Sequence, residues 1–169
     1  MTGVPAAFLD RDGVLIEDSG YPHRSEHLKL IPGAAAAVRR MNQGGYRTVI
    51  VTNQSGVARG LFSEAQMNAF NDLLVARLAQ NGAVIDAVYA APFHPDAVEA
   101  RYRHPDHPDR KPNPGMLLRA IAEHDLDPVR SFIIGDQKRD LQAGERAGVA
   151  GFLFEGGDLD AFVRDVVGL

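Results

Sequence analysis

Short apolar runs alternate with helical segments along the whole chain, and this alternation limits the fold more than any other feature of the sequence. The apolar runs have the length and composition of buried strands. We expect strands over residues 4–9, 46–52, 84–91, 131–134 and 149–154, and helices over residues 34–41, 63–78, 114–124, 138–147 and 158–167. Such alternation predicts an α/β fold, in which helices cover both faces of a mostly parallel five-stranded sheet.

Two segments break this alternation. Residues 14–30 are rich in turn-forming residues and predict a loop or small flap. Residues 92–114 contain six prolines and three of the six histidines without any apolar period, which predicts a long structured loop. Loops of this length inside compact domains usually serve a function or are disordered.

Bulk properties exclude several classes of protein. A chain of 169 residues predicts one domain over 1–169. The net charge of −4 and the absence of a basic block argue against a nucleic-acid partner. No apolar run approaches the length of a membrane span and no secretion signal is visible, so neither the membrane nor secretion is expected. The chain contains no cysteine, which excludes disulfides and thiol catalysis and fits the cytoplasm.

Asp10 and Asp12 follow the first predicted strand and flank Arg11, and Gly13 comes next. Two carboxylates this close repel each other unless a cation or a reaction uses them. Asp10 is the candidate nucleophile, because a carboxylate can attack phosphorus to give an aspartyl phosphate. Asp12 is the candidate general acid and base. The alternative for Asp10 alone is a residue that caps a turn.

The other polar candidates also stand at or near the ends of predicted strands. Thr52 and Asn53 could bind phosphate oxygens, although both are common at strand ends. Lys111 could neutralise a transferring phosphoryl group, and Arg110 could bind the substrate. Ligands bind at the carboxyl edge of such sheets, and we expect Asp10, Thr52, the approach to His94 and Asp136 to converge there.

A magnesium site is predicted at the same edge. Asp136 follows the fourth predicted strand. With Asp10 and the backbone carbonyl of Asp12, it would form the hard-oxygen ligand set that Mg²⁺ prefers. Asp140, one helical turn later, is predicted to orient these ligands and not to bind the metal directly.

The same residues, in this order, resemble the haloacid dehalogenase superfamily of phosphatases. The resemblance covers nearly the whole chain and rests on DRDGV at 10–14, Thr52, Lys111 and GDQKRD at 135–140. FLDRDG at 8–13, GY at 20–21, TNQSGVARG at 52–60 and RKP at 110–112 are similar to one branch of it. That branch contains D-glycero-D-manno-heptose 1,7-bisphosphate phosphatase and histidinol-phosphate phosphatase.

The resemblance implies a Rossmann-like three-layer sandwich with little or no cap domain. It implies a Mg²⁺-dependent phosphomonoester hydrolase with an aspartyl-phosphate intermediate, acting on a small phosphorylated substrate, and we expect a monomer. The implied substrate is a sugar bisphosphate, cleaved at the 7-phosphate of the heptose, and the alternative is histidinol phosphate or another small phosphomonoester. The implied substrate contacts are Arg11, Asp18, Ser19, Gly20, Tyr21, Asn53, Gln54, Ser55, Arg59, Arg110 and Lys111.

The chain departs from this branch in two places. Members often bind a structural zinc in the long loop through three cysteines and a histidine, where this chain has Ala91, Phe93, His107 and Asp109. Since a structural zinc usually needs four sulfur or imidazole ligands, we expect no zinc, and prolines stiffen the loop instead. His94 and His104 leave a small chance, roughly one in six, of another site.

The second departure is Gln137, where the heptose enzymes place a lysine that contacts substrate. The neighbouring Lys138 would point elsewhere on a helix. A rival of another class is a receiver-like signalling module, which accepts phosphate on an aspartate without turnover. Asp12 argues against the module, because a second carboxylate placed for proton transfer favours release of phosphate.

Overall fold

The computed structural model describes residues 3–169, so the first two residues of the predicted domain lie outside it. Within this range the chain forms one sheet of five parallel strands in the order β3-β2-β1-β4-β5. The strands are β1 (Ala6–Leu9), β2 (Arg47–Asn53), β3 (Ala87–Ala91), β4 (Phe132–Gly135) and β5 (Ala150–Leu153). The predicted α/β fold class is confirmed.

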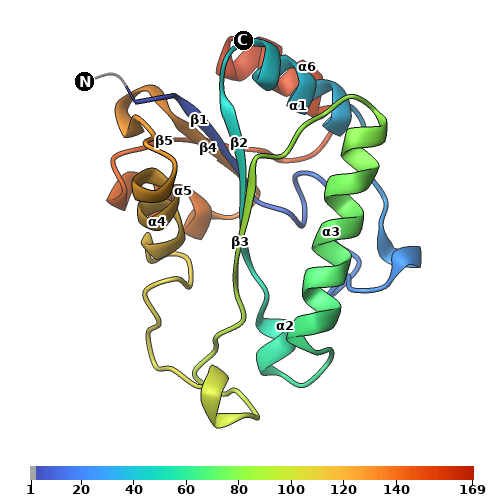
Figure 1. The fold of residues 1–169 in the computed structure, drawn as a ribbon, viewed down its shortest axis with the longest axis vertical. Helices are drawn as coiled ribbons and strands as arrows, with labels where there is room; N and C mark the ends of the chain where they lie inside the picture. The colour runs from blue at the N-terminus through green and yellow to red at the C-terminus, as the bar shows by residue number, and fades with distance from the viewer. Residues whose placement is uncertain (1–2) are drawn as a thin grey trace.

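Helices cover both faces of the sheet (Figure 1). One face carries α1 (Ala34–Gln43), α3 (Glu64–Gln80) and α6 (Leu159–Phe162), which continues as a π-helical turn over Val163–Val167. The opposite face carries α4 (Gly115–Glu123) and α5 (Lys138–Arg146). The short α2 (Ser55–Ala58) follows β2, and single 3-10 turns span Ser25–His27, Ala100–Tyr102 and Pro128–Arg130.

The strands are apolar because both of their faces are buried. Along β1, Ala7 and Leu9 pack into the core under α1, α3 and α6, whereas Ala6 and Phe8 pack under α4 and α5. Alternate side chains of a strand point to opposite faces, so a strand covered on both sides is apolar without interruption. Because β1 pairs in parallel with both β2 and β4, the carboxyl ends of these three strands lie side by side at one edge of the sheet.

Two of the predicted helices, over 63–78 and 158–167, begin with a side-chain cap. The Ser63 hydroxyl accepts a hydrogen bond from the Gln66 N–H, and the Gln66 side chain accepts from the Ser63 N–H, which completes the capping box of α3. The Asp158 carboxylate accepts from the Ala161 N–H at the start of α6. Within residues 3–169, no helix is both long and apolar enough to cross a bilayer.

Two predictions about the elements were wrong. The third strand begins at Ala87 and not at residue 84, because the Asn42 side chain takes both backbone groups of Val84. The Asp86 carboxylate then accepts from the Thr48 N–H. The one-turn helix α2 was not predicted, since TNQSGVARG has no apolar period.

Candidate active site

A cavity of about 310 Å³ opens at the carboxyl edge of the sheet. Its wall gathers nearly all of the predicted residues from segments that are far apart in the sequence. They are Asp10, Asp12, Asp18, Gly20, Tyr21, Thr52, Asn53, Gln54, Ser55, Arg59, Arg110, Lys111 and Asp136, and Gln137 and Arg139 join them. The lining is dominated by charged and amide side chains, which suits a small polar ligand with several charges.

Lys111 brings a buried positive charge to Asp10. Its Nζ lies 3.0 Å from Oδ1 of Asp10, donates to the Val51 carbonyl at 2.8 Å and lies 2.6 Å from Oδ1 of Asp140. Burial acts to lower the pKa of Lys111, but the two carboxylates outweigh it and hold this pKa above its usual value. The lysine therefore keeps its charge beside the candidate nucleophile.

The Asp10 carboxyl is in an environment that disfavours its ionised form. Burial raises the pKa of Asp10 to about 8, with further contributions from the like charges of Asp140 and Asp12, and against the lowering effect of Lys111. Because only an ionised carboxylate attacks phosphorus well, this site gains from additional positive charge close to Asp10.

Three carboxylates lie close enough together to bind one cation. Asp10, Asp136 and Asp140 each offer an oxygen, and these oxygens lie within 4.8 Å of one another. Asp136 makes no ion pair with the part of the chain that the structure describes, whereas Asp140 is paired with Lys111. Its Oδ2 also accepts from the Gln137 N–H at 3.0 Å. Both oxygens of Asp140 are thus engaged, whereas the bonds that Asp10 accepts from Lys111 and from the Arg11 N–H both fall on Oδ1 and leave its Oδ2 without a partner among the described residues. This supports the prediction that Asp140 orients the site, and Asp10 and Asp136 remain as the available oxygen ligands.

Glycines make room for these carboxylates. Gly13 has a φ of +85°, and a Cβ there would lie 2.1 Å from Oδ2 of Asp136. A Cβ on Gly135 would lie 2.2 Å from the Cβ of Asp140. Any larger residue at these places would displace a carboxylate, so the hard-oxygen set and the space around it fit a divalent cation such as Mg²⁺.

The predicted substrate contact at Arg11 is not seen. Arg11 is fully buried and does not line the cavity; its guanidinium binds the Asp12 carboxylate instead. The guanidinium also donates to the Pro22 carbonyl and to Oδ1 of Asn71, and these bonds hold it in the protein interior. Ser19 is exposed and also lies outside the cavity wall, whereas its neighbours Asp18, Gly20 and Tyr21 line it.

The amides after β2 are largely engaged with the protein. The Asn53 side chain donates to the Lys111 carbonyl at 3.0 Å and accepts from the Lys111 N–H at 2.9 Å, so it fixes the loop that carries the lysine. The Gln54 side chain donates to the Thr52 hydroxyl at 2.8 Å. Asn53 and Gln54 thus shape the cavity wall, and Thr52 presents its hydroxyl there from the end of β2.

Three arginines from separate elements ring the cavity: Arg59 after α2, Arg110 in the long loop and Arg139 in the first turn of α5. The Nε of Arg110 is buried without a hydrogen-bond partner among the described residues. Sequence reasoning missed Arg139. A basic residue in the first turn of a helix opposes the helix dipole, and that signal could have identified it.

In the long loop, the side chains of Phe93 and His107 stack on each other, at two of the four positions where relatives in this branch often bind zinc. The rings of Phe93 and His107 lie 3.5 Å apart between centroids and only 8° from parallel. Burial is the main cause that lowers the pKa of His107, and Asp109 forms an ion pair with Arg119 at 2.9 Å. Each of these side chains is thus engaged in a contact within the protein.

Family models and relatives of known name are similar to this chain over most of its length. The family model described as haloacid dehalogenase-like hydrolase matches residues 7–73, and the HAD-hydrolase-like model matches residues 109–161. The chain is 46% identical to D-glycero-beta-D-manno-heptose-1,7-bisphosphate 7-phosphatase of Rhodopseudomonas palustris, over 96% of this chain and 90% of that protein.

Two crystal structures are similar to this fold. A HAD-like phosphatase from Mesorhizobium loti superposes with a TM-score of 0.87 and 42% identity, over 93% of this chain and 75% of that chain. The D,D-heptose 1,7-bisphosphate phosphatase from B. bronchiseptica, complexed with magnesium and phosphate, superposes with a TM-score of 0.79 and 38% identity. The match covers 92% of this chain and 83% of that chain.

Proposed function

Because this chain belongs to the haloacid dehalogenase-like hydrolase family, we propose that it is a phosphatase that removes one phosphate from a sugar bisphosphate. The proposed substrate is D-glycero-D-manno-heptose 1,7-bisphosphate, cleaved at its 7-phosphate, because relatives 40–46% identical to this chain over most of its length are named for that reaction. One observation carries the proposal: a buried lysine lies 3.0 Å from a carboxylate at the floor of a polar cavity.

In the first half of the proposed reaction, Asp10 is the nucleophile. One of its carboxylate oxygens attacks phosphorus, the ester bond between phosphorus and the sugar oxygen breaks, and the protonated Asp12 carboxyl gives its proton to that oxygen. In the second half, the Asp12 carboxylate takes a proton from water as the water attacks phosphorus. The bond between phosphorus and Asp10 then breaks and inorganic phosphate leaves.

Lys111 and Thr52 complete the proposed reaction centre. The Lys111 ammonium stabilises the negative charge that spreads over the phosphoryl oxygens, and its own position is fixed because Asn53 clamps its backbone. The Thr52 hydroxyl would bind one of these oxygens. Burial makes the ammonium more effective, since fewer waters screen its charge.

Mg²⁺ is the proposed cofactor. Asp10 and Asp136 would hold it with the backbone carbonyl of Asp12, and Asp140 would keep these ligands in place. When bound, the ion supplies positive charge that favours ionised Asp10 and neutralises phosphoryl oxygens. The glycine at position 13, which leaves space at the Asp136 carboxylate, supports this assignment.

The second phosphate of a bisphosphate is proposed to bind at the ring of arginines. Arg59, Arg110 and Arg139 carry guanidinium groups, which pair with phosphate through two parallel hydrogen bonds. We infer that Arg139 supplies the positive charge that Gln137 lacks. The flap residues Asp18, Gly20 and Tyr21 would contact the sugar between the two phosphates.

The rival of a phospho-accepting signalling module is rejected, because the relatives are named phosphatases. We propose that one chain is sufficient for activity. We also propose that the chain forms one hydrolase domain that works in the cytoplasm without structural zinc.

A kinetic panel tests the proposed function. Phosphate release with Mg²⁺ would be measured for both anomers of the heptose 1,7-bisphosphate, fructose 1,6-bisphosphate and histidinol phosphate. We expect the highest kcat/KM for one heptose anomer. A higher kcat/KM for histidinol phosphate would identify that compound, the alternative, as the substrate. The absence of turnover on all four compounds would reject the proposal that the protein is a phosphatase.

A further inference from the structure

Arg11 occupies an unusual place for a charged residue. It lies between the two carboxylates of the DRD motif, yet its side chain is completely buried beneath the cavity. Arginine is almost never fully buried unless it is paired, because the loss of hydration must be offset by hydrogen bonds. Its contacts therefore indicate what the residue is for.

The first set of contacts holds the Asp12 carboxylate. The Nε of Arg11 donates to Oδ1 at 2.8 Å, and Nη2 donates to Oδ2 at 3.3 Å. Two parallel bonds between a planar guanidinium and a carboxylate fix the plane of the carboxylate as well as its position. Oδ2 also accepts from Nε2 of Gln54 at 3.5 Å, whereas Oδ1 keeps a second lone pair for proton transfer.

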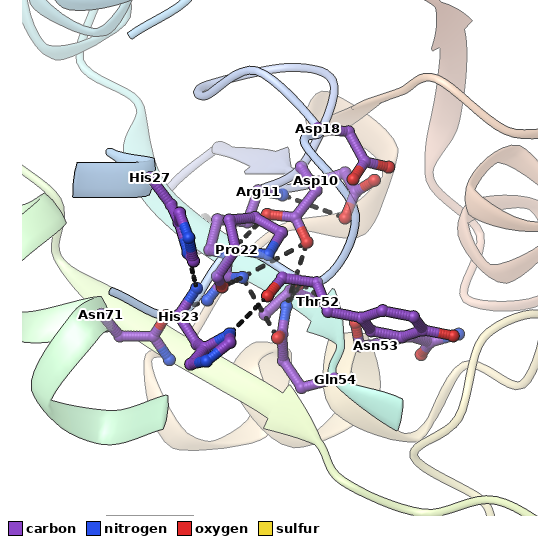
Figure 2. Close-up of polar contacts among 12 residues, drawn as sticks. Asp10, Arg11, Asp18, Pro22, His23, His27, Thr52, Asn53, Gln54 and Asn71 are labelled. Atoms are coloured by element: carbon purple, nitrogen blue, oxygen red, sulfur yellow. Dashed lines mark hydrogen bonds and ion pairs between the residues drawn. The ribbon is translucent and has the colours of Figure 1, made fainter. Parts of the chain in front are cut away.

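The second set of contacts anchors Arg11 to three other segments. Its Nη2 also donates to the Pro22 carbonyl in the flap at 2.9 Å and to Oε1 of Gln54 at 3.1 Å. Its Nη1 donates to Oδ1 of Asn71 in α3 at 2.8 Å. Figure 2 shows Asn71, Pro22 and Gln54 reaching toward Arg11 from these separate segments.

The Arg11 guanidinium also packs against a ring of α3. The Cζ of Arg11 lies 4.8 Å from the centre of the Phe70 ring, and Phe70 is itself buried in the core. A guanidinium over an aromatic face is attracted by the negative electrostatic potential of that face, which arises from the ring quadrupole. The Asp12 carboxylate is thereby connected through Arg11 to a long helix and to the docked flap.

We propose that Arg11 is a positioning residue, whose buried guanidinium orients the Asp12 carboxylate toward the reacting phosphoryl group. Its bond to the Pro22 carbonyl couples this orientation to the docking of the flap. This inference rests on the proposed acid–base role of Asp12. Arg11 does not touch the substrate, so its loss alters the proton-transfer steps and leaves substrate binding nearly unchanged.

An aryl phosphate separates the two proton transfers. The nitrophenolate of p-nitrophenyl phosphate leaves without needing a proton, so the first half of the reaction does not depend on Asp12. The second half still does, because water must lose a proton as it attacks the phosphoryl group on Asp10. A variant with a misaimed Asp12 therefore releases one equivalent of nitrophenolate quickly and then turns over slowly.

The test compares Arg11→Lys with the wild type by rapid mixing with p-nitrophenyl phosphate and Mg²⁺. We expect the first turnover to change by less than about 3-fold, and steady-state kcat to fall about 10- to 100-fold with KM within about 3-fold. Amide hydrogen exchange over residues 14–30 should become faster. Equal losses in both phases, or a flap whose exchange does not change, would overturn the proposal.

Two further variants keep the test decisive. Arg40→Lys breaks an equally bidentate pair with Asp160, formed by bonds of 2.8 and 3.1 Å far from the cavity, and should leave both phases unchanged. Asn71→Ala removes the hydrogen bond from α3 to Arg11, keeps the Phe70 contact, and should slow the second phase about 3- to 10-fold. If Arg11→Lys does not fold, Asn71→Ala decides, and an unchanged second phase in that variant overturns the proposal.

The failure of this inference differs from the failure of the proposed function. If Asp12→Asn shows normal turnover, the acid–base role is wrong and the phosphatase mechanism must be revised. If Asp12→Asn stalls after the first turnover while Arg11→Lys behaves like the wild type, the mechanism stands and only the positioning role is rejected.

Discussion

The Nζ of Lys111 lies 2.6 Å from Oδ1 of Asp140, and both side chains are only 1% exposed. This buried pair occupies one of the three carboxylates that could bind a cation. Together with Asp10 and the Val51 carbonyl, Asp140 gives the ammonium three close oxygen partners, which restrict its rotation beside the nucleophile. The site is thus built around a shared positive charge, with Asp136 as its free carboxylate.

Replacement of the shared charge should abolish most of the activity. Lys111→Met removes a group that stabilises the phosphoryl charge, and we expect kcat to fall about 10²- to 10³-fold, or about 2.7–4 kcal/mol in the barrier. The control is Lys29→Met, which removes an exposed lysine that does not line the cavity. Steady-state phosphate release measures both, and a loss below tenfold for Lys111→Met would contradict the assigned role.

The nucleophile is tested by replacing one carboxylate oxygen with an amide NH2 group. Asp10→Asn keeps the shape of the side chain but removes the attacking oxygen, so turnover should fall at least about 10³-fold while circular dichroism stays unchanged. Asp125→Asn is the matched control, because Asp125 has a φ of +50° and asparagine tolerates that conformation. Near-normal turnover in Asp10→Asn would mean that another residue attacks phosphorus.

Gly13 should control the affinity for Mg²⁺. In Gly13→Ala the new Cβ would lie 2.1 Å from Oδ2 of Asp136, so the carboxylate must move and half-maximal activity should need about tenfold more Mg²⁺. Gly45→Ala adds the same methyl group at a φ of +83° with nothing within 4 Å. Magnesium titrations of both variants separate the contact with Asp136 from backbone strain, and equal shifts would refute the contact.

Arg139 should select for a second phosphate. Arg139→Gln removes one guanidinium from the cavity rim, and we expect KM for a sugar bisphosphate to rise about tenfold. KM for p-nitrophenyl phosphate should stay within about 2-fold, because that substrate has no second phosphate. Lys138→Gln is the control, since Lys138 is the exposed neighbour outside the cavity wall. A similar rise in KM for both substrates would place Arg139 at the reacting phosphate.

The long loop should be stable without a metal. The Phe93 and His107 rings stack at 3.5 Å, so Phe93→Ala should lower the free energy of unfolding by about 1–3 kcal/mol. Treatment of the wild type with a chelator should leave its Tm unchanged within about 2 °C when no Mg²⁺ is present beforehand. Stoichiometric zinc in elemental analysis of the purified protein would show that the loop uses other ligands.

The layered fold was predictable because its determinants are local. The apolar run of β1 and the alternation of strands and helices identify a parallel sheet covered on both faces. The helices predicted over 63–78 and 158–167 are present, and Ser63 and Asp158 cap their first turns. The exceptions depend on distant residues, as at Val84, whose backbone groups are taken by Asn42 from another element.

By itself, the sequence determined that Asp10, Thr52 and Asp136 meet at one edge, since parallel strands bring their carboxyl ends together. Lys111 lies in the long loop, and its contact with Asn53 at the end of β2 holds it at that edge. Only the tertiary structure decided which neighbour each charge would have. It buried Arg11 against Asp12 and paired Lys111 with Asp140, and it brought Arg139 into the cavity wall. The physical reason is that a pattern of residues records which side chains are charged, whereas distance and burial set how strongly two charges interact.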